Sequence, residues 1–252
     1  MDNSTYVGTM VPHRSPRTLR FASYNIRKAR GLDGQRDPGR ILQVLNGLDA
    51  DVIALQEADR RLGDRPAALP RRMIEAETDF EVLPTAENGV SLGWHGNAVL
   101  VRKGIEAGGI QRIDLPGLEP RGAVYFEIDL GPMSVAVMGA HLGLMRRHRR
   151  RQLETLAMHA QGRDDAIILG DFNEWSTRRG LEPLTPKFSV ISPGQSFHAA
   201  RPVAALDRIA HSNNIGVADA GVEQGPLAKL ASDHLPIWAD LKLPRQSFAA
   251  TD

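Results

Sequence analysis

Short apolar runs alternate with amphipathic stretches through residues 19–243 of this 252-residue chain. Continuous apolar runs of about four to eight residues predict strands with both faces buried. We expect such strands over residues 19–24, 52–56, 97–101, 123–128, 134–140, 166–171, 206–211 and 235–241. The polar flanks, residues 1–18 and 244–252, are expected to be a flexible leader and a tail around one domain over residues 19–243.

Other stretches have the spacing of amphipathic helices. Asp37 is suited to cap a helix whose first residue is Pro38, and apolar residues between positions 41 and 48 would form one buried face. Further helices are predicted around residues 71–77 and 147–161. Strands and helices mixed along the whole chain predict a layered α/β fold.

Composition narrows the class of protein. The hydrophobic fraction of 42% and the charged fraction of 24% are ordinary for a globular domain. A net charge of +1 provides no strong global attraction to nucleic acid or anionic membranes, and the absence of cysteine excludes disulfides and thiolate metal sites. Since no signal segment or long apolar span is visible, we expect a cytoplasmic protein without stable membrane insertion. No protein partner is indicated.

Polar side chains stand at the ends of the expected strands. Asp171 and Asn173 follow a buried apolar run, and residues two apart in an extended chain point the same way. Similar positions are held by Asn25, Glu57, His141, Asp207 and the segment Ser232-Asp233-His234. A single strand-end Asp or Asn is usually a turn former. Strands of one sheet bring their ends together, however, so the repeated pattern predicts a shared site.

The order of these segments resembles the endonuclease/exonuclease/phosphatase superfamily, which has the DNase I-like fold. The segments that carry the resemblance are Tyr24-Asn25, Gln56-Glu57, Gly96-Asn97-Ala98, Gly139-Ala140-His141-Leu142, Gly170-Asp171-Phe172-Asn173, Leu206-Asp207-Arg208-Ile209 and Ser232-Asp233-His234. The resemblance covers about residues 19–243 and implies a four-layer α/β sandwich, in which two packed mixed β-sheets are flanked by helices. It also implies a metal-dependent phosphoesterase that hydrolyses its substrate by in-line attack of an activated water.

The resemblance implies a metal site built from oxygen ligands. Glu57 would be the principal metal carboxylate, with Asn25 beside it and Asp233 as a second ligand. A small set of oxygen ligands suits Mg²⁺, which keeps several waters, and Mn²⁺ is a reasonable substitute.

The remaining strand-end residues take catalytic roles by the same resemblance. Asp171 would orient or deprotonate the attacking water, and Asn173 would hold that water and a phosphate oxygen. His141 and His234 would contact the scissile phosphate, and Asp207 would orient His234 through a hydrogen bond. The arrangement would neutralise the charge that develops at phosphorus.

Several interpretations stay open at this point. Arg121 and Asn97 are candidates for substrate binding, and each is equally compatible with a structural role. The basic run Arg146–Arg151 resembles a nucleic-acid patch but starts an amphipathic helix, where charge runs are mostly solvated faces. By the same resemblance the substrate would be a phosphate ester of a small molecule, a lipid-derived molecule or a nucleic acid, and near-neutral charge favours the first two. The alternative function is a DNA or RNA endonuclease or exonuclease, and a non-catalytic binding module on the same fold is the alternative from another class.

Overall fold

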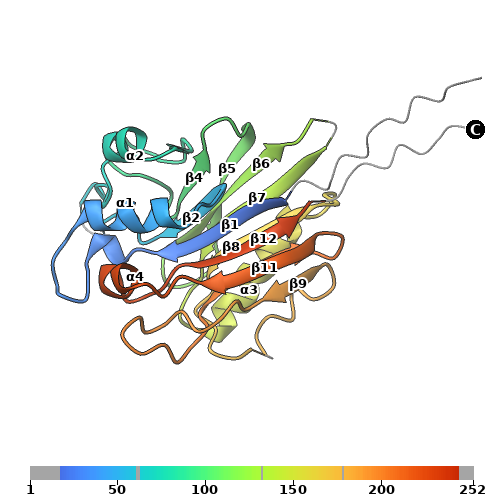
Figure 1. The fold of residues 1–252 in the computed structure, drawn as a ribbon. Coiled ribbons are helices and arrows are strands. Elements are labelled where there is room, and N and C mark those ends of the chain that lie inside the picture. Colours follow the sequence, from blue (N-terminus) through green and yellow to red (C-terminus); the bar gives the residue numbers. More distant parts are fainter. Residues whose placement is uncertain (1–17, 61–62, 132, 178, 244–252) are drawn as a thin grey trace, which may run out of the picture.

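The computed structural model describes residues 18–60, 63–131, 133–177 and 179–243, and these form two six-stranded sheets (Figure 1). The first sheet has the strand order β11-β12-β1-β2-β4-β3. Its strands are β1 (Thr18–Asn25), β2 (Val52–Gln56), β3 (Phe80–Val82), β4 (Ala98–Arg102), β11 (Gly216–Val222) and β12 (Ile237–Lys242).

The second sheet has the order β5-β6-β7-β8-β10-β9. Its strands are β5 (Ala107–Leu115), β6 (Arg121–Asp129), β7 (Ser134–His141), β8 (Ala166–Asp171), β9 (Phe188–Ile191) and β10 (Asp207–Ser212). Each sheet contains one parallel pair, β1–β2 in the first and β7–β8 in the second, and its other pairs are antiparallel. Both sheets are therefore mixed.

The helices are α1 (Pro38–Gly47), α2 (Arg71–Glu77), α3 (Arg146–His159) and α4 (Pro226–Ala231), with a short 3₁₀ turn η1 (Arg27–Ala29). The cap of α1 forms as expected, because the Asp37 side chain accepts a hydrogen bond of 2.9 Å from the backbone N–H of Arg40. The proposed leader and tail lie outside the described residues, except for Thr18, which begins β1.

Three apolar clusters separate four layers. Neighbouring residues of a strand point to opposite faces, so in β1 Phe21 joins the cluster between the two sheets and Ala22 joins the cluster beneath α1, α2 and α4. In β8, Ile167 faces the first sheet, whereas Ile168 packs with Leu153 of α3. The four-layer α/β sandwich expected from the resemblance is confirmed.

Strand direction collects the polar strand ends at one edge of this sandwich. The two parallel pairs contribute residues from their carboxyl ends: Asn25 is in register with Gln56, and His141 is in register with Asp171. A strand antiparallel to β8 has its first residue at this same edge. Asp207, the first residue of β10, therefore lies in register with Asp171. The sheets pack directly at β1 and β8.

A glycine allows the close pairing beneath this edge. Gly170 has a φ of +154°, and a side chain there would run into the backbone carbonyl of Ala140 in β7. Only glycine fits this position, directly before Asp171.

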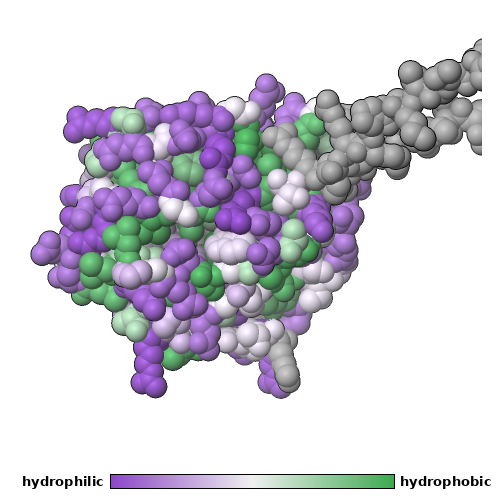
Figure 2. Space-filling view, viewed as in Figure 1, coloured by the Kyte–Doolittle hydropathy of each residue, from purple (hydrophilic) through white to green (hydrophobic). Residues whose placement is uncertain are grey.

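Within the described residues, no helix is both long enough and apolar enough to cross a bilayer. Figure 2 shows hydrophilic residues spread over the visible face, with apolar residues scattered between them.

Candidate active site

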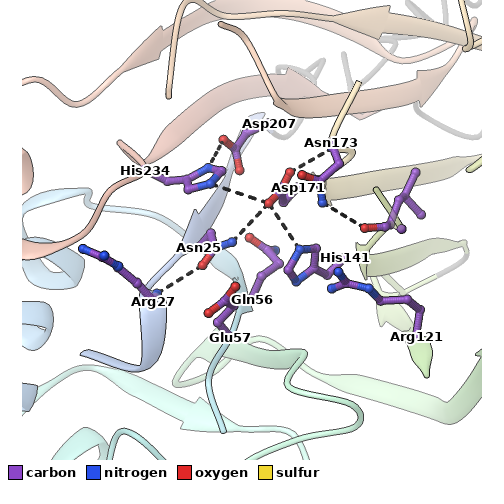
Figure 3. Close-up of polar contacts among 12 residues, drawn as sticks. Asn25, Arg27, Gln56, Glu57, Arg121, His141, Asp171, Asn173, Asp207 and His234 are labelled. Atoms are coloured by element: carbon purple, nitrogen blue, oxygen red, sulfur yellow. Dashed lines mark hydrogen bonds and ion pairs between the residues drawn. The ribbon is translucent and has the colours of Figure 1, made fainter. Parts of the chain in front are cut away.

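Asp171, at the end of β8, is the centre of the polar cluster at this edge (Figure 3). Its Oδ2 accepts a hydrogen bond of 3.1 Å from Asn25 Nδ2, a residue of the other sheet. The same oxygen lies 3.4 Å from His141 Nε2 and 3.7 Å from His234 Nε2. Asp171 is 1% exposed, so the negative charge of its carboxylate is compensated by these nitrogens rather than by bulk water.

His234 is held between two carboxylates. Its Nδ1 donates to Asp207 Oδ2 over 2.9 Å, and its Nε2 faces Asp171. The same Asp207 oxygen accepts a hydrogen bond of 2.5 Å from the Ser196 hydroxyl, and Asp207 is fully buried. Ser196 therefore fixes the carboxylate that orients the imidazole.

The two histidines carry different charges. Burial lowers the pKa of His234, but Asp207 and Asp171 outweigh this effect and raise it to about 9. Burial lowers the pKa of His141 to about 3, with Asp171 opposing the shift only in part and Arg121 adding to it. At neutral pH the site thus presents one imidazolium and one neutral imidazole on either side of Asp171.

Asn173 is positioned by the backbone that follows β8. Its backbone N–H donates to Asp171 Oδ1 at 2.9 Å, and its side-chain Nδ2 donates to the carbonyl of Leu142, also at 2.9 Å. Its φ of +50° places it in the left-handed region, which asparagine tolerates better than most residues. Asn173 therefore lies beyond the end of β8 and not on an extended strand, and its backbone N–H, not its side-chain amide, contacts Asp171.

Each of the expected metal ligands has a basic or backbone N–H partner. Glu57 has a φ of +52° and pairs with the Lys28 ammonium, and Asp233 Oδ2 lies 3.2 Å from Arg27 Nε. Asn25 Oδ1 accepts from the backbone N–H of Arg27 at 3.1 Å. The atoms available to bind a metal are all oxygen atoms, which suits a hard divalent cation. The Lys28 ammonium beside Glu57 shows that this position accepts a positive charge.

A second group, formed by Asp171, Asp207 and His234, also brings three potential ligand atoms close together. In this group His234 hydrogen bonds to Asp207 and has its pKa raised to about 9. His234 would have to lose a ring proton before it could bind a metal, whereas the oxygen ligands expected from the sequence, Glu57, Asn25 and Asp233, need no such loss. Both groups are candidate metal sites.

The two candidates for substrate binding differ in their surroundings. Arg121 donates to Glu119 over 2.8 Å and lies beside His141 in a pocket, and its buried Nε has no hydrogen-bond partner in the described part of the chain. Asn97 is buried, and its Nδ2 donates to the carbonyls of Trp94 and Gly122. Arg121 therefore lines the pocket with a donor that is not engaged in the described part of the chain, whereas the Asn97 amide joins the turn before β4 to β6.

The basic run at the start of α3 is partly structural. Arg149 is buried and donates to Glu174 at 2.7 Å, and Arg146 donates to the same carboxylate at 2.8 and 3.1 Å. Glu174 is itself buried, next to Asn173. These two arginines thus anchor the loop that carries Asn173, while Arg147 and Arg150 are exposed.

Strained backbone is concentrated around the site. Among the described residues other than glycine, all but Asp49 of those with positive φ surround these groups: Arg27, Lys28, Ala29, Glu57, Arg65, His95 and Asn173. Such conformations cost about 1–3 kcal/mol each and persist where the surrounding structure imposes them, typically at functional sites.

Some supporting residues were not expected from the sequence. Ser196 carries no signal, because it meets Asp207 only through the fold. Arg208 is fully buried and donates to the carbonyls of Asp207 and Glu174, so it ties the start of β10 to the loop that follows β8. The sequence does contain one indication of this role: Arg208 is a charged residue inside the otherwise mostly apolar run 206–211, where a buried charge needs a partner.

Comparison with known proteins finds relatives in sequence and in fold. The uncharacterized protein YbhP of Escherichia coli K12 is 33% identical over 165 residues, a match that spans 60% of this chain and 64% of that protein. The structure of an endonuclease/exonuclease/phosphatase from Beutenbergia cavernae superposes with a TM-score of 0.71 at 21% identity, covering 90% of this chain and 72% of that one. A mannosyl-6-phosphatase from Bacteroides thetaiotaomicron gives a TM-score of 0.68 at 18% identity, covering 89% and 100%.

The family model described as "Endonuclease/Exonuclease/phosphatase family" matches residues 22–234, which include every strand end that forms the site. The chain therefore belongs to the endonuclease/exonuclease/phosphatase family.

Proposed function

We propose that this protein is a metal-dependent phosphoesterase that hydrolyses a phosphate ester by in-line attack of an activated water. The observation that carries the proposal is the convergence on Asp171 Oδ2 of Asn25 from the end of β1, His141 from the end of β7 and His234 from the segment before β12. Membership in a family of nucleases and phosphatases supports the reaction type. A non-catalytic module would have no need of an imidazolium buried between two carboxylates, which is costly to maintain.

The roles follow from charge and position. Asp171 accepts the proton of the attacking water as the new P–O bond forms and the ester P–O bond breaks. His234, held protonated by Asp207, stabilises negative charge on the phosphoryl group. Neutral His141 and the Asn173 amide act as hydrogen-bonding groups without adding charge. Each group is pre-positioned, so little reorganisation is needed during the reaction.

We propose Mg²⁺, or Mn²⁺ in its place, as the metal. Glu57 and Asn25 would hold it, with Asp233 as a further oxygen ligand; Lys28 and Arg27 now neutralise two of these groups. The ion would supply positive charge toward the phosphoryl oxygens.

The substrate is proposed to be a small or lipid-derived phosphate ester. The net charge is only +1. In the basic run, the buried Arg149 and also Arg146 donate hydrogen bonds to the Glu174 carboxylate. Both facts weaken the alternative of a nuclease that grips a nucleic-acid backbone through the basic run.

A substrate panel separates these possibilities. Purified protein is incubated with bis-p-nitrophenyl phosphate, p-nitrophenyl phosphate and supercoiled plasmid, each with Mg²⁺, with Mn²⁺ and with EDTA. Metal-dependent release of nitrophenol without nicking supports the proposed function. Salt-sensitive nicking in its place supports the nuclease, and inactivity on all substrates with either metal contradicts a phosphoesterase.

A further inference from the structure

A pocket of about 290 Å³ opens beside Glu57 and His141, and three of its basic residues, Arg60, Arg65 and His95, have no role in the reaction described above. We call it the arginine pocket. The basic groups that line it, besides His141, are Lys28, Arg60, Arg65, His95 and Arg121. It adjoins both the proposed metal carboxylate and a histidine of the phosphate site, so one substrate could occupy both places.

The carboxylates of this pocket are already engaged. Glu119 accepts from Arg121 at 2.8 Å, and Glu57 pairs with Lys28. Asp59 is buried and accepts from two backbone N–H groups, of Leu92 at 2.6 Å and of Gly93 at 3.3 Å. None of the three forms an ion pair with Arg60 or Arg65, although Asp59 is close enough to Arg65 for the charge of Arg65 to lower the pKa of Asp59.

Arg60 and Arg65 have no carboxylate within ion-pair distance in the described part of the chain. Arg65 Nη1 donates to His95 Nδ1 over 3.1 Å, and because a guanidinium can only donate, that nitrogen must be the acceptor. Burial, followed by the charge of Arg65, lowers the pKa of His95, so the imidazole stays neutral. The pocket thus holds two guanidinium groups that form no ion pair in the described part of the chain, although the charge of Arg65 acts on the nearby Asp59 carboxylate.

The two arginines are held to different degrees. The backbone N–H of Arg60 donates to the carbonyl of Pro66 at 2.9 Å, whereas its side chain is exposed. The Arg65 guanidinium is held by His95, and the turn that carries His95 is closed by mutual backbone hydrogen bonds of 2.8 Å between Trp94 and Asn97. A guanidinium that is already held in place loses little entropy on binding an anion.

We propose that the arginine pocket binds a second acidic group of the substrate, a phosphate or a carboxylate, while the scissile phosphate lies at Asp171. The inference rests on the proposed function and narrows its substrate class to small phosphate esters with a second anionic group. The volume of about 290 Å³ lies at the lower end for ligand pockets, which suits one compact group. Guanidinium groups are well matched to phosphate and carboxylate oxygens.

The test uses two ligands that differ in one group. 2-Phosphoglycerate carries a carboxylate where glycerol 2-phosphate carries a hydroxymethyl group, and calorimetry measures the binding of each without turnover. We expect wild-type protein to bind 2-phosphoglycerate about tenfold more tightly or better, as charge-assisted hydrogen bonds provide. Arg65→Gln and Arg60→Gln should each reduce this ratio, and the double variant should bring it to about one. Arg150→Gln, an exposed arginine on α3, should retain the full ratio.

Equal affinities in wild-type protein, or a ratio unchanged in the double variant, would overturn the proposal. A nucleic acid could also supply the second phosphate, so the same measurement is made with a thymidine dinucleotide that carries a 5′-phosphate and with one that lacks it. If the protein prefers the 5′-phosphorylated dinucleotide but shows no preference for 2-phosphoglycerate, the pocket binds nucleic acid and the small-substrate class is refuted. If the protein prefers 2-phosphoglycerate but hydrolyses none of the phosphate esters, only the proposed function is contradicted. If it hydrolyses phosphate esters but shows no such preference, only the proposal for the arginine pocket is contradicted.

Discussion

Asn25 Nδ2 lies 3.1 Å from Asp171 Oδ2, and this hydrogen bond joins the end of β1 in one sheet to the end of β8 in the other. The hydrogen bond therefore links Asn25, a proposed metal ligand, to Asp171, the residue proposed to activate the water. The chemistry therefore depends on how the two sheets pack, and a change in either sheet should affect both halves.

Asn25→Ala removes an oxygen donor of the metal site together with this hydrogen bond. We expect a loss of about 10- to 100-fold in apparent affinity for Mg²⁺ or in activity. The measurement is the rate of bis-p-nitrophenyl phosphate hydrolysis as Mg²⁺ is titrated. Asn213→Ala, in the exposed turn after β10, is the matched control and should titrate like wild type. Identical Mg²⁺ curves for Asn25→Ala and wild type would refute this role.

Asp207→Asn leaves the shape of the pocket intact but weakens the charge that holds His234. We expect kcat to fall by about 10²- to 10⁴-fold, since the imidazole loses its orientation and its proton. Ser196→Ala should lower kcat by a smaller factor with little change in KM, because Ser196 acts only through Asp207.

Ser196→Thr keeps the hydroxyl and serves as the matched variant. Recovery of kcat in Ser196→Thr relative to Ser196→Ala is the expected result. Equal kcat values for wild type and Asp207→Asn would show that His234 does not depend on the Asp207 carboxylate for its orientation or its charge.

Lys28→Met removes the ammonium that pairs with Glu57. We expect tighter binding of Mn²⁺, by about tenfold or more, because a cation near Glu57 opposes a second one. Calorimetry of Mn²⁺ binding checks this, with Lys229→Met on α4 as the control lysine. Unchanged or weaker binding in Lys28→Met would mean that the lysine does not compete with the metal.

The buried carboxylate of Glu174 makes stability depend on acid pH. Burial acts to raise the pKa of Glu174, but hydrogen bonds from Arg146 and Arg149 outweigh it and hold the pKa at about 2. A lowered folded-state pKa means that this stabilisation is complete above the ordinary value of 4.5 and is lost as the pH falls toward about 2.

Glu174→Gln should therefore reduce the free energy of unfolding by about 3 kcal/mol at pH 7, because it leaves Arg149 buried without its partner. The difference from wild type should shrink as the pH approaches about 3, where the wild-type stabilisation is itself being lost. Urea unfolding at the two pH values measures it, with the exposed Glu154→Gln on α3 as control. A difference that grows toward acid pH would contradict a lowered pKa of Glu174 in the folded protein.

The sequence predicts the interior of both sheets and misses their edges. The strands expected from apolar runs correspond to β1, β2, β4, β6, β7, β8, β10 and β12, with ends that shift by one or two residues. The strands without a clear signal, β3, β5, β9 and β11, are the edge strands of the two sheets. An edge strand pairs on one side only and is less buried, and β11 (Gly216–Val222) has only exposed and half-buried residues. Its sequence therefore lacks the apolar run.

The site divides in the same way. Asp171, His141 and Asn25 stand at the ends of predicted strands, so their convergence could be anticipated from strand direction. Arg65 and His95 lie on loops that meet only through the fold, and nothing local in the sequence marks that contact. The pocket beside the site is a product of tertiary structure, whereas the polar strand ends are a product of local pattern.

The central claim is that Asp171 activates water for hydrolysis at phosphorus. The measurement that tests it most directly is kcat/KM for bis-p-nitrophenyl phosphate with saturating Mg²⁺, in wild type and in Asp171→Asn, after urea unfolding has shown both to be folded. We predict a loss of about 10³-fold or more in Asp171→Asn, the scale expected when the proton acceptor of the reaction is removed. A folded Asp171→Asn variant that retains wild-type kcat/KM would contradict the claim.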